Sequence, residues 1–61
     1  MNEPFEINVY VEDDFVTDFQ SIIVPSIGHT ISMDYKGRFR VTGVEWRIGT
    51  RFYINLYCEK L

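Results

Sequence analysis

The chain has 61 residues, of which 46% are hydrophobic and 16% aromatic, and its formal net charge at pH 7 is −3. A chain of this length forms one small domain, 1–61, which buries only about 60% of the surface exposed on unfolding. This composition excludes intrinsic disorder, and the single cysteine excludes a disulfide framework. No apolar run approaches the roughly 20 residues that span a bilayer, and the charged start, with Glu3 and Glu6, is unlike a signal peptide.

The amino-acid composition favours β structure. The chain contains no alanine and two leucines, but thirteen isoleucines and valines together with four threonines. β-Branched side chains lose rotamer freedom in a helix and pack well on a pleated sheet. We therefore expect an all-β protein.

The N-terminal half predicts two strands. Apolar residues alternate with polar ones from Phe5 to Val11, which is typical of a half-buried strand, and the acidic stretch 12–14 supplies turn residues. Residues 15–24 fit either a strand that returns antiparallel to the first or a short amphipathic helix, and their β-branched content favours the strand. A turn follows, in which we expect Ile27 to be a buried anchor.

The next stretch predicts a β-hairpin with a three-residue loop that ends at Gly37, because glycine suits the left-handed third position of such a loop. In this register Met33 pairs with Phe39 on the core face. The same register pairs Asp34 with Arg38 on the solvent face, so the charged and the apolar residues predict the same strand alignment.

A second hairpin follows the first. The alternation changes phase at Thr42 and Gly43, which predicts a β-bulge that bends one long strand. A three-residue loop then pairs Ile48 with Phe52, and the last strand turns its even-numbered side chains inward, with Cys58 as a small buried side chain.

These patterns predict a small antiparallel barrel or a strongly curled sheet of four to five strands. Bulge-bent long strands are how small sheets curl. The predicted core contains Ile7, Val9, Ile31, Phe39, Val41, Val44, Trp46, Ile54 and Leu56.

Two runs, VPSIGHTI at 24–31 and FRVTGVEW at 39–46, resemble small SH3-like β-barrel proteins of the kind encoded by bacteriophages and mobile elements. The resemblance covers residues 24–58 and rests on a Pro-x-x-Gly turn and a V-T-x-V-x-W strand, which are markers of fold. It implies an SH3-like barrel, a phage-like origin and a cytoplasmic location in a bacterial host. It transfers no functional residue.

The sequence contains little that indicates catalysis. His29 is the only histidine available to activate Ser26 or Ser32, and no third partner accompanies it. His29, Asp34 and Cys58 lack a recognised metal-ligand spacing. We therefore expect no enzymatic activity, no metal site and no cofactor.

Charge is unevenly distributed along the chain. Residues 1–28 carry six acidic residues and no lysine or arginine, whereas residues 29–61 carry six basic residues against three acidic ones. Either the charges of the two halves compensate each other across the protein surface, or the two halves present a bipolar docking surface. The candidate binding residues lie on the outer face of the second half: Arg38, Arg40, Arg47, Arg51, Tyr53 and Tyr57.

Three classes of function fit such a surface. The first is a protein-binding module, such as a phage-type accessory or inhibitor protein that docks on a host protein, since tyrosine and arginine are favoured interface anchors. The second is an oligomeric assembly protein, because small chains gain stability by association. The third is a nucleotide- or nucleic-acid-binding module, which a pI of about 4.8 disfavours.

Overall fold

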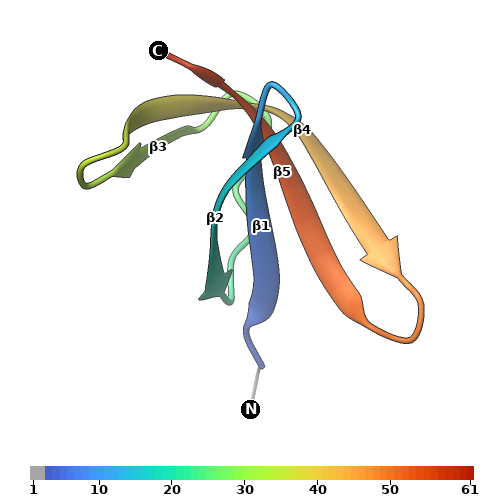
Figure 1. Cartoon of the computed structure of the whole chain (residues 1–61). Helices are drawn as coiled ribbons and strands as arrows, with labels where there is room; N and C mark the ends of the chain where they lie inside the picture. Colours follow the sequence, from blue (N-terminus) through green and yellow to red (C-terminus); the bar gives the residue numbers. More distant parts are fainter. Residues whose placement is uncertain (1–2) are drawn as a thin grey trace.

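The computed structural model of the protein describes residues 3–61 and contains five strands and no helix in that range (Figure 1). This confirms the all-β prediction. The strands are β1 (Phe5–Val11), β2 (Asp14–Ser21), β3 (Thr30–Met33), β4 (Gly37–Ile48) and β5 (Phe52–Lys60).

The five strands form one curled sheet in the order β2-β1-β5-β4-β3. Three neighbouring pairs are antiparallel, and β1 runs parallel to β5. The parallel pair departs from the antiparallel arrangement that we expected throughout, because alternation identifies strands without identifying their neighbours. The N-terminal strand thus lies between β2 and the last strand of the chain.

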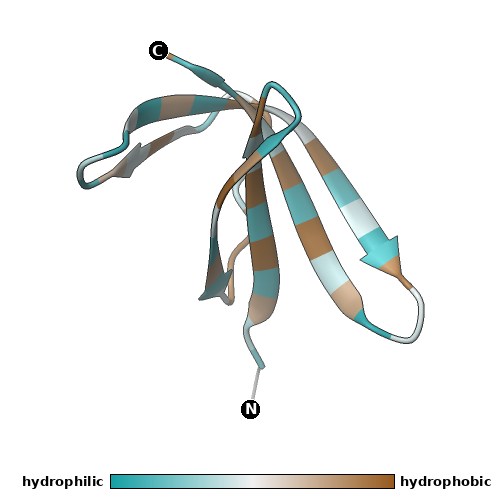
Figure 2. Ribbon diagram, in the orientation of Figure 1, coloured by the Kyte–Doolittle hydropathy of each residue, from teal (hydrophilic) through white to brown (hydrophobic). Residues whose placement is uncertain are grey.

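The sheet curls around a single apolar core. Alternating hydrophobic and hydrophilic bands run along β1 and β5, as each face of the sheet requires (Figure 2). Burial of one large apolar side chain contributes about 1.5–3 kcal/mol. The buried residues are Ile7, Val9, Phe39, Val41, Ile54, Leu56 and Cys58.

Most of the predicted core is confirmed. Six of its nine members are buried, and Ile31 and Val44 are half-buried against the others. Trp46 is 50% exposed and Ile27 is 67% exposed, so the predictions that these two side chains are buried are wrong. Trp46 lies in the half of β4 that pairs with β5 alone, and Ile27 lies in the connection between β2 and β3, outside the sheet.

The bulge in β4 is confirmed. Val41 pairs with Cys58 and Gly43 with Tyr57, which leaves Thr42 as the extra residue. The Thr42 hydroxyl donates a hydrogen bond to the Tyr57 carbonyl over 3.1 Å. Because of the bulge, the apolar residues of the second half of the strand also face the inner side of the sheet.

The register of the β3–β4 hairpin differs by two residues from the predicted register. Ile31 pairs with Phe39 and Met33 with Gly37, so the predicted pairs Met33–Phe39 and Asp34–Arg38 are wrong. A shift of two residues keeps every side chain on its face, and the apolar pattern therefore does not distinguish the two registers.

The loop has the predicted three residues but begins one residue earlier than predicted. The loop consists of residues 34–36, and the Lys36 amide donates to the Met33 carbonyl over 3.1 Å. Gly37 has a positive φ of 106°, as predicted, but Tyr35 also adopts a left-handed φ of 68°. A large side chain seldom occupies that region.

Residues 15–24 form a strand as far as Ser21, which confirms the strand and rejects the helix. Val11 pairs with Asp14, so the connecting loop consists of Glu12 and Asp13, with positive φ angles of 52° and 67°. Two consecutive left-handed residues are typical of the hairpin turn that matches strand twist.

Candidate functional site

The β4–β5 hairpin positions the residues with the strongest potential for binding. Ile48 pairs with Phe52 and Arg47 with Tyr53, which confirms the predicted three-residue loop. Ile48 and Phe52 therefore project on the inner face of the sheet, and Arg47 and Tyr53 on the outer face.

Three aromatic rings meet on the inner face near this hairpin. Phe5 contacts Trp46 and Phe52 edge-on, with ring centroids 5.6 Å apart in both pairs. Trp46 and Phe52 stack with centroids 5.8 Å apart and an interplanar angle of 20°. Each such pair stabilises the fold by about 0.5–1.5 kcal/mol beyond the contribution of buried area, and so holds the rings in place. We call Phe5, Trp46 and Phe52 the aromatic cluster.

Four exposed isoleucines lie in segments next to the aromatic cluster. Ile48 is 83% exposed on the same hairpin. Ile22 and Ile23 are exposed directly after Ser21, the partner of Phe5. Ile27 lines a groove of about 420 Å³ together with Trp46. The aromatic cluster and these four isoleucines form what we call the apolar end.

The apolar end is large enough for an interface. A fully exposed apolar side chain of this size offers about 200 Å², so its exposed members offer on the order of 700 Å². A typical stable interface takes about 800 Å² from each partner. Exposed apolar surface of several hundred Å² on a small protein is often functional.

Arg51 lies on the outer side of the hairpin loop and is held by Glu6. Its guanidinium donates to both Glu6 carboxylate oxygens, over 2.7 and 2.9 Å, and lies 5.9 Å from the centroid of the Tyr53 ring. The hydrogen bond to Glu6 raises the pKa of Arg51 above its ordinary value. This contact joins the acidic and basic halves of the sequence.

Arg47 and Glu45 lie on the outer face beside a hydrogen-bonded network. Arg47 forms an ion pair with Glu45 at 3.7 Å. Asn55 and the Tyr57 hydroxyl donate to the Glu45 carboxylate over 3.1 and 2.8 Å. Hydrogen bonds from Asn55 and Tyr57, and the charge of Arg47, lower the pKa of Glu45, and the bond to Glu45 raises the pKa of Tyr57.

The structure divides the candidate arginines into two groups. Arg47, Arg51 and Tyr53 line a shallow pocket of about 340 Å³ at the hairpin end. Arg38 and Arg40 lie near the opposite end of β4, beyond the bulge, and Arg40 pairs with Glu59 at 3.3 Å. The six candidate residues share the outer face without forming one compact patch, because Arg40 and Arg47 lie seven positions apart along β4.

His29 has a local role in the turn that precedes β3. Its Nδ1 accepts a hydrogen bond from the Ser26 amide over 3.1 Å, and its own amide donates to the Ser26 carbonyl. Among residues 3–61, no group of three His, Cys, Asp or Glu is placed to hold a metal ion. The described chain also has no helix that is long and apolar enough to cross a membrane.

Sequence reasoning missed the apolar end because alternation places Trp46, Ile48 and Phe52 inward, next to the core. One signal was available. The strand partner predicted on the other side of the long strand ends at Met33 and covers only the first half of that strand. Inward residues beyond the bulge therefore lack a strand neighbour on that side.

A scan against protein-family models found no match to this chain. Searches of curated proteins and of solved structures likewise found no significant similarity. The resemblance to SH3-like barrels therefore stays a prediction.

Proposed function

We propose that the protein is a non-enzymatic protein-binding module that docks through the apolar end, with Arg47 and Arg51 at its margin. The partner that fits is a protein surface with an apolar centre and carboxylates at its edge. One observation carries this proposal: Trp46 is half exposed within the aromatic cluster, and Ile48 stands exposed beside it.

The energetics of interfaces support this assignment. Aromatic and arginine side chains dominate binding energy, and they do so when an apolar centre is surrounded by a polar rim. The ion pairs of Arg47 and Arg51 are at the surface, where such pairs contribute about 0–1 kcal/mol. A partner carboxylate therefore competes with Glu45 and Glu6 at little cost.

The two other classes of function have weaker support. Three arginines, Arg40, Arg47 and Arg51, already pair with carboxylates of this chain, and the acidic pI opposes binding of a polyanion. Self-association through the apolar end would bring together two copies that each carry a net charge of −3. A phage-type accessory or inhibitor protein acting in a bacterial cytoplasm is the biological setting that the predicted resemblance suggests.

A capture experiment with immobilised full-length chain and bacterial lysate tests the proposal. The informative variant is Ile48→Glu, and the matched control is Leu61→Glu, which places the same charge at another exposed apolar residue. A partner that wild type and the control retain, and that Ile48→Glu loses at least tenfold, supports docking at the apolar end.

The second pair of variants addresses the two groups of arginines. We expect Arg47→Glu with Arg51→Glu to weaken capture and Arg38→Glu with Arg40→Glu to leave it unchanged. Unchanged capture of the partner by Ile48→Glu contradicts the proposed surface, and so does loss of capture in Arg38→Glu with Arg40→Glu. Capture of no protein contradicts the proposed function.

A further inference from the structure

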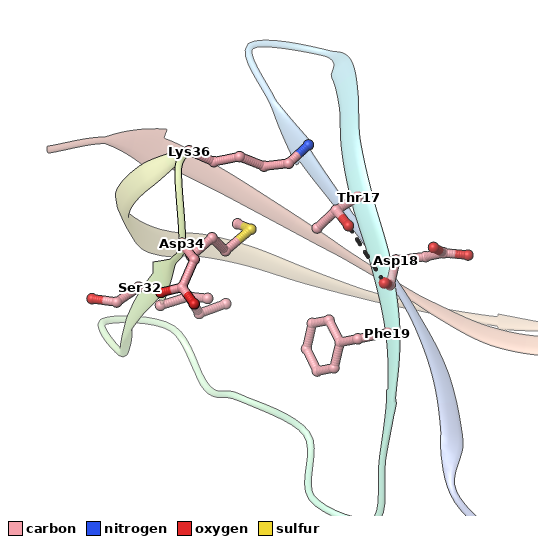
Figure 3. Close-up of a pocket in the computed structure, with 8 residues that line it drawn as sticks. Thr17, Asp18, Phe19, Ser32, Asp34 and Lys36 are labelled. Carbon is pink, nitrogen blue, oxygen red and sulfur yellow. Dashed lines mark hydrogen bonds between the residues drawn. The ribbon is translucent and has the colours of Figure 1, made fainter.

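The two edge strands of the sheet, β2 and β3, face each other across an opening in the barrel wall. The curl brings them to opposite sides of a pocket of about 420 Å³ (Figure 3). Each edge has a strand neighbour on one side only. Backbone amides and carbonyls on the free side of an edge strand are a template for another strand.

At one end the opening is slightly narrower than an inserted strand requires. The Lys36 side chain extends across it (Figure 3). Its Nζ donates to the Val16 carbonyl on β2 over 3.1 Å. An extended lysine side chain reaches about 6 Å, so the two walls lie no more than about 9 Å apart there. A strand inserted between two others needs about 9.6 Å, twice the usual spacing, so the two edges must separate slightly at this end to admit one.

The inner side of the opening is apolar. Phe19 projects from β2 toward β3 (Figure 3), and Ile31 and Met33 line the pocket from the other wall. All three are half-buried against the core. Inward side chains of an added strand would lie on this apolar floor.

Two carboxylates mark the outer side and one end of the opening. Asp34 turns into the pocket, and Asp18 points away from it on the outer face of β2 (Figure 3). Within residues 3–61 neither carboxylate forms an ion pair. Outward side chains of an added strand would lie beside Asp18 as cross-strand neighbours, and the charge there favours lysine or arginine.

We propose that an extended segment of a partner protein, with alternating apolar and basic residues, binds in this opening as a sixth strand. Its backbone replaces the Lys36 amine at the Val16 carbonyl and pairs with the free edges, as in strand-addition complexes. A second copy of this chain fits less well, because pairing two β2 edges would set Asp14 and Asp18 of one copy against those of the other.

Peptide titration of the full-length chain tests this site. The probe is an eight-residue peptide that alternates valine with lysine, and the control peptide alternates valine with glutamate. We expect the lysine peptide to shift the amide resonances of β2 and β3 and to slow hydrogen exchange at their free edges. We expect no binding of the glutamate peptide.

Charge reversal supplies the matched variants. Asp18→Lys with Asp34→Lys should weaken binding of the lysine peptide by about five- to tenfold. Glu12→Lys with Asp13→Lys changes the net charge equally, in the exposed loop before β2, and should change binding by less than about twofold. A thermal melt of each variant verifies folding.

Several outcomes overturn the proposal. They are equal binding of the two peptides, equal losses in the two double variants, and resonance shifts centred on Trp46 and Ile48. The last outcome would assign the peptide to the apolar end instead. Failure of this test leaves docking at the apolar end intact, since the two surfaces share no residue.

Discussion

The two halves of β4 carry the same alternation and have different surroundings. In the first half, Phe39 is 4% exposed, whereas in the second half Ile48 is 83% exposed. The first half lies between β5 and β3 and also bonds to the backbone at Gly28 and His29. The second half pairs with β5 alone. Alternation therefore decides which face a side chain occupies, and the neighbouring elements decide whether it is buried.

The largest expected effect comes from truncating one large side chain in each half. Phe39→Ala should cost about 3–5 kcal/mol, which approaches the whole stability of about 3–9 kcal/mol for a domain of this size. Trp46→Ala should cost about 1.5–2 kcal/mol, because half of its surface is already exposed. Urea denaturation followed by circular dichroism measures both. Equal losses of unfolding free energy in the two variants would mean that the two side chains are buried to the same extent.

The rate of thiol labelling compares a buried position beside the first half of β4 with an exposed position in its second half. Cys58 is buried beside Val41, and desolvation raises the pKa of its thiol, so native protein should react slowly. The double variant Ile48→Cys with Cys58→Val should react at the rate of a free thiol. Cys58→Val alone should cost less than about 1.5 kcal/mol. Rapid labelling of Cys58 in folded protein would place the last strand in the opposite phase.

The loops that flank β4 differ in backbone strain. Tyr35, in the loop before the strand, is fully exposed at a φ of 68°, so Tyr35→Asn should raise stability by about 0.5–1 kcal/mol. Thr50→Asn in the loop after the strand is the control and should be neutral. Thermal melting measures both, and a loss of stability in Tyr35→Asn would show that the exposed ring makes a stabilising contact.

The smallest effect is a change in pH dependence on the outer face of the second half. The folded protein lowers the pKa of Glu45 below its ordinary value of 4.5. The resulting stability is present above pH 4.5 and is lost as the pH falls through the folded pKa. Glu45→Gln should flatten the melting temperature between pH 5 and pH 3. An unchanged acid profile would mean that the bonds from Asn55 and Tyr57 do not favour the ionised form.

The sequence by itself determined the strands, the bulge at Thr42 and the inward or outward direction of most side chains. Period-two alternation and turn residues are local properties, so Cys58 and the Ile48–Phe52 pairing followed from them. The candidate site was only partly accessible in this way: Arg47, Arg51 and Tyr53 lie together as their strand positions suggest, while Arg38 and Arg40 lie beyond the bend.

Only the tertiary structure decided which strands are neighbours and how much each inward side chain is covered. The parallel pairing of β1 with β5 joins residues 47 positions apart, and no local pattern specifies such a contact. The exposure of Trp46 and the opening between β2 and β3 follow from that topology, because a five-stranded sheet with these neighbours curls around its centre and leaves one end and one seam uncovered. Burial is a property of what packs against a residue, and a single strand does not encode it.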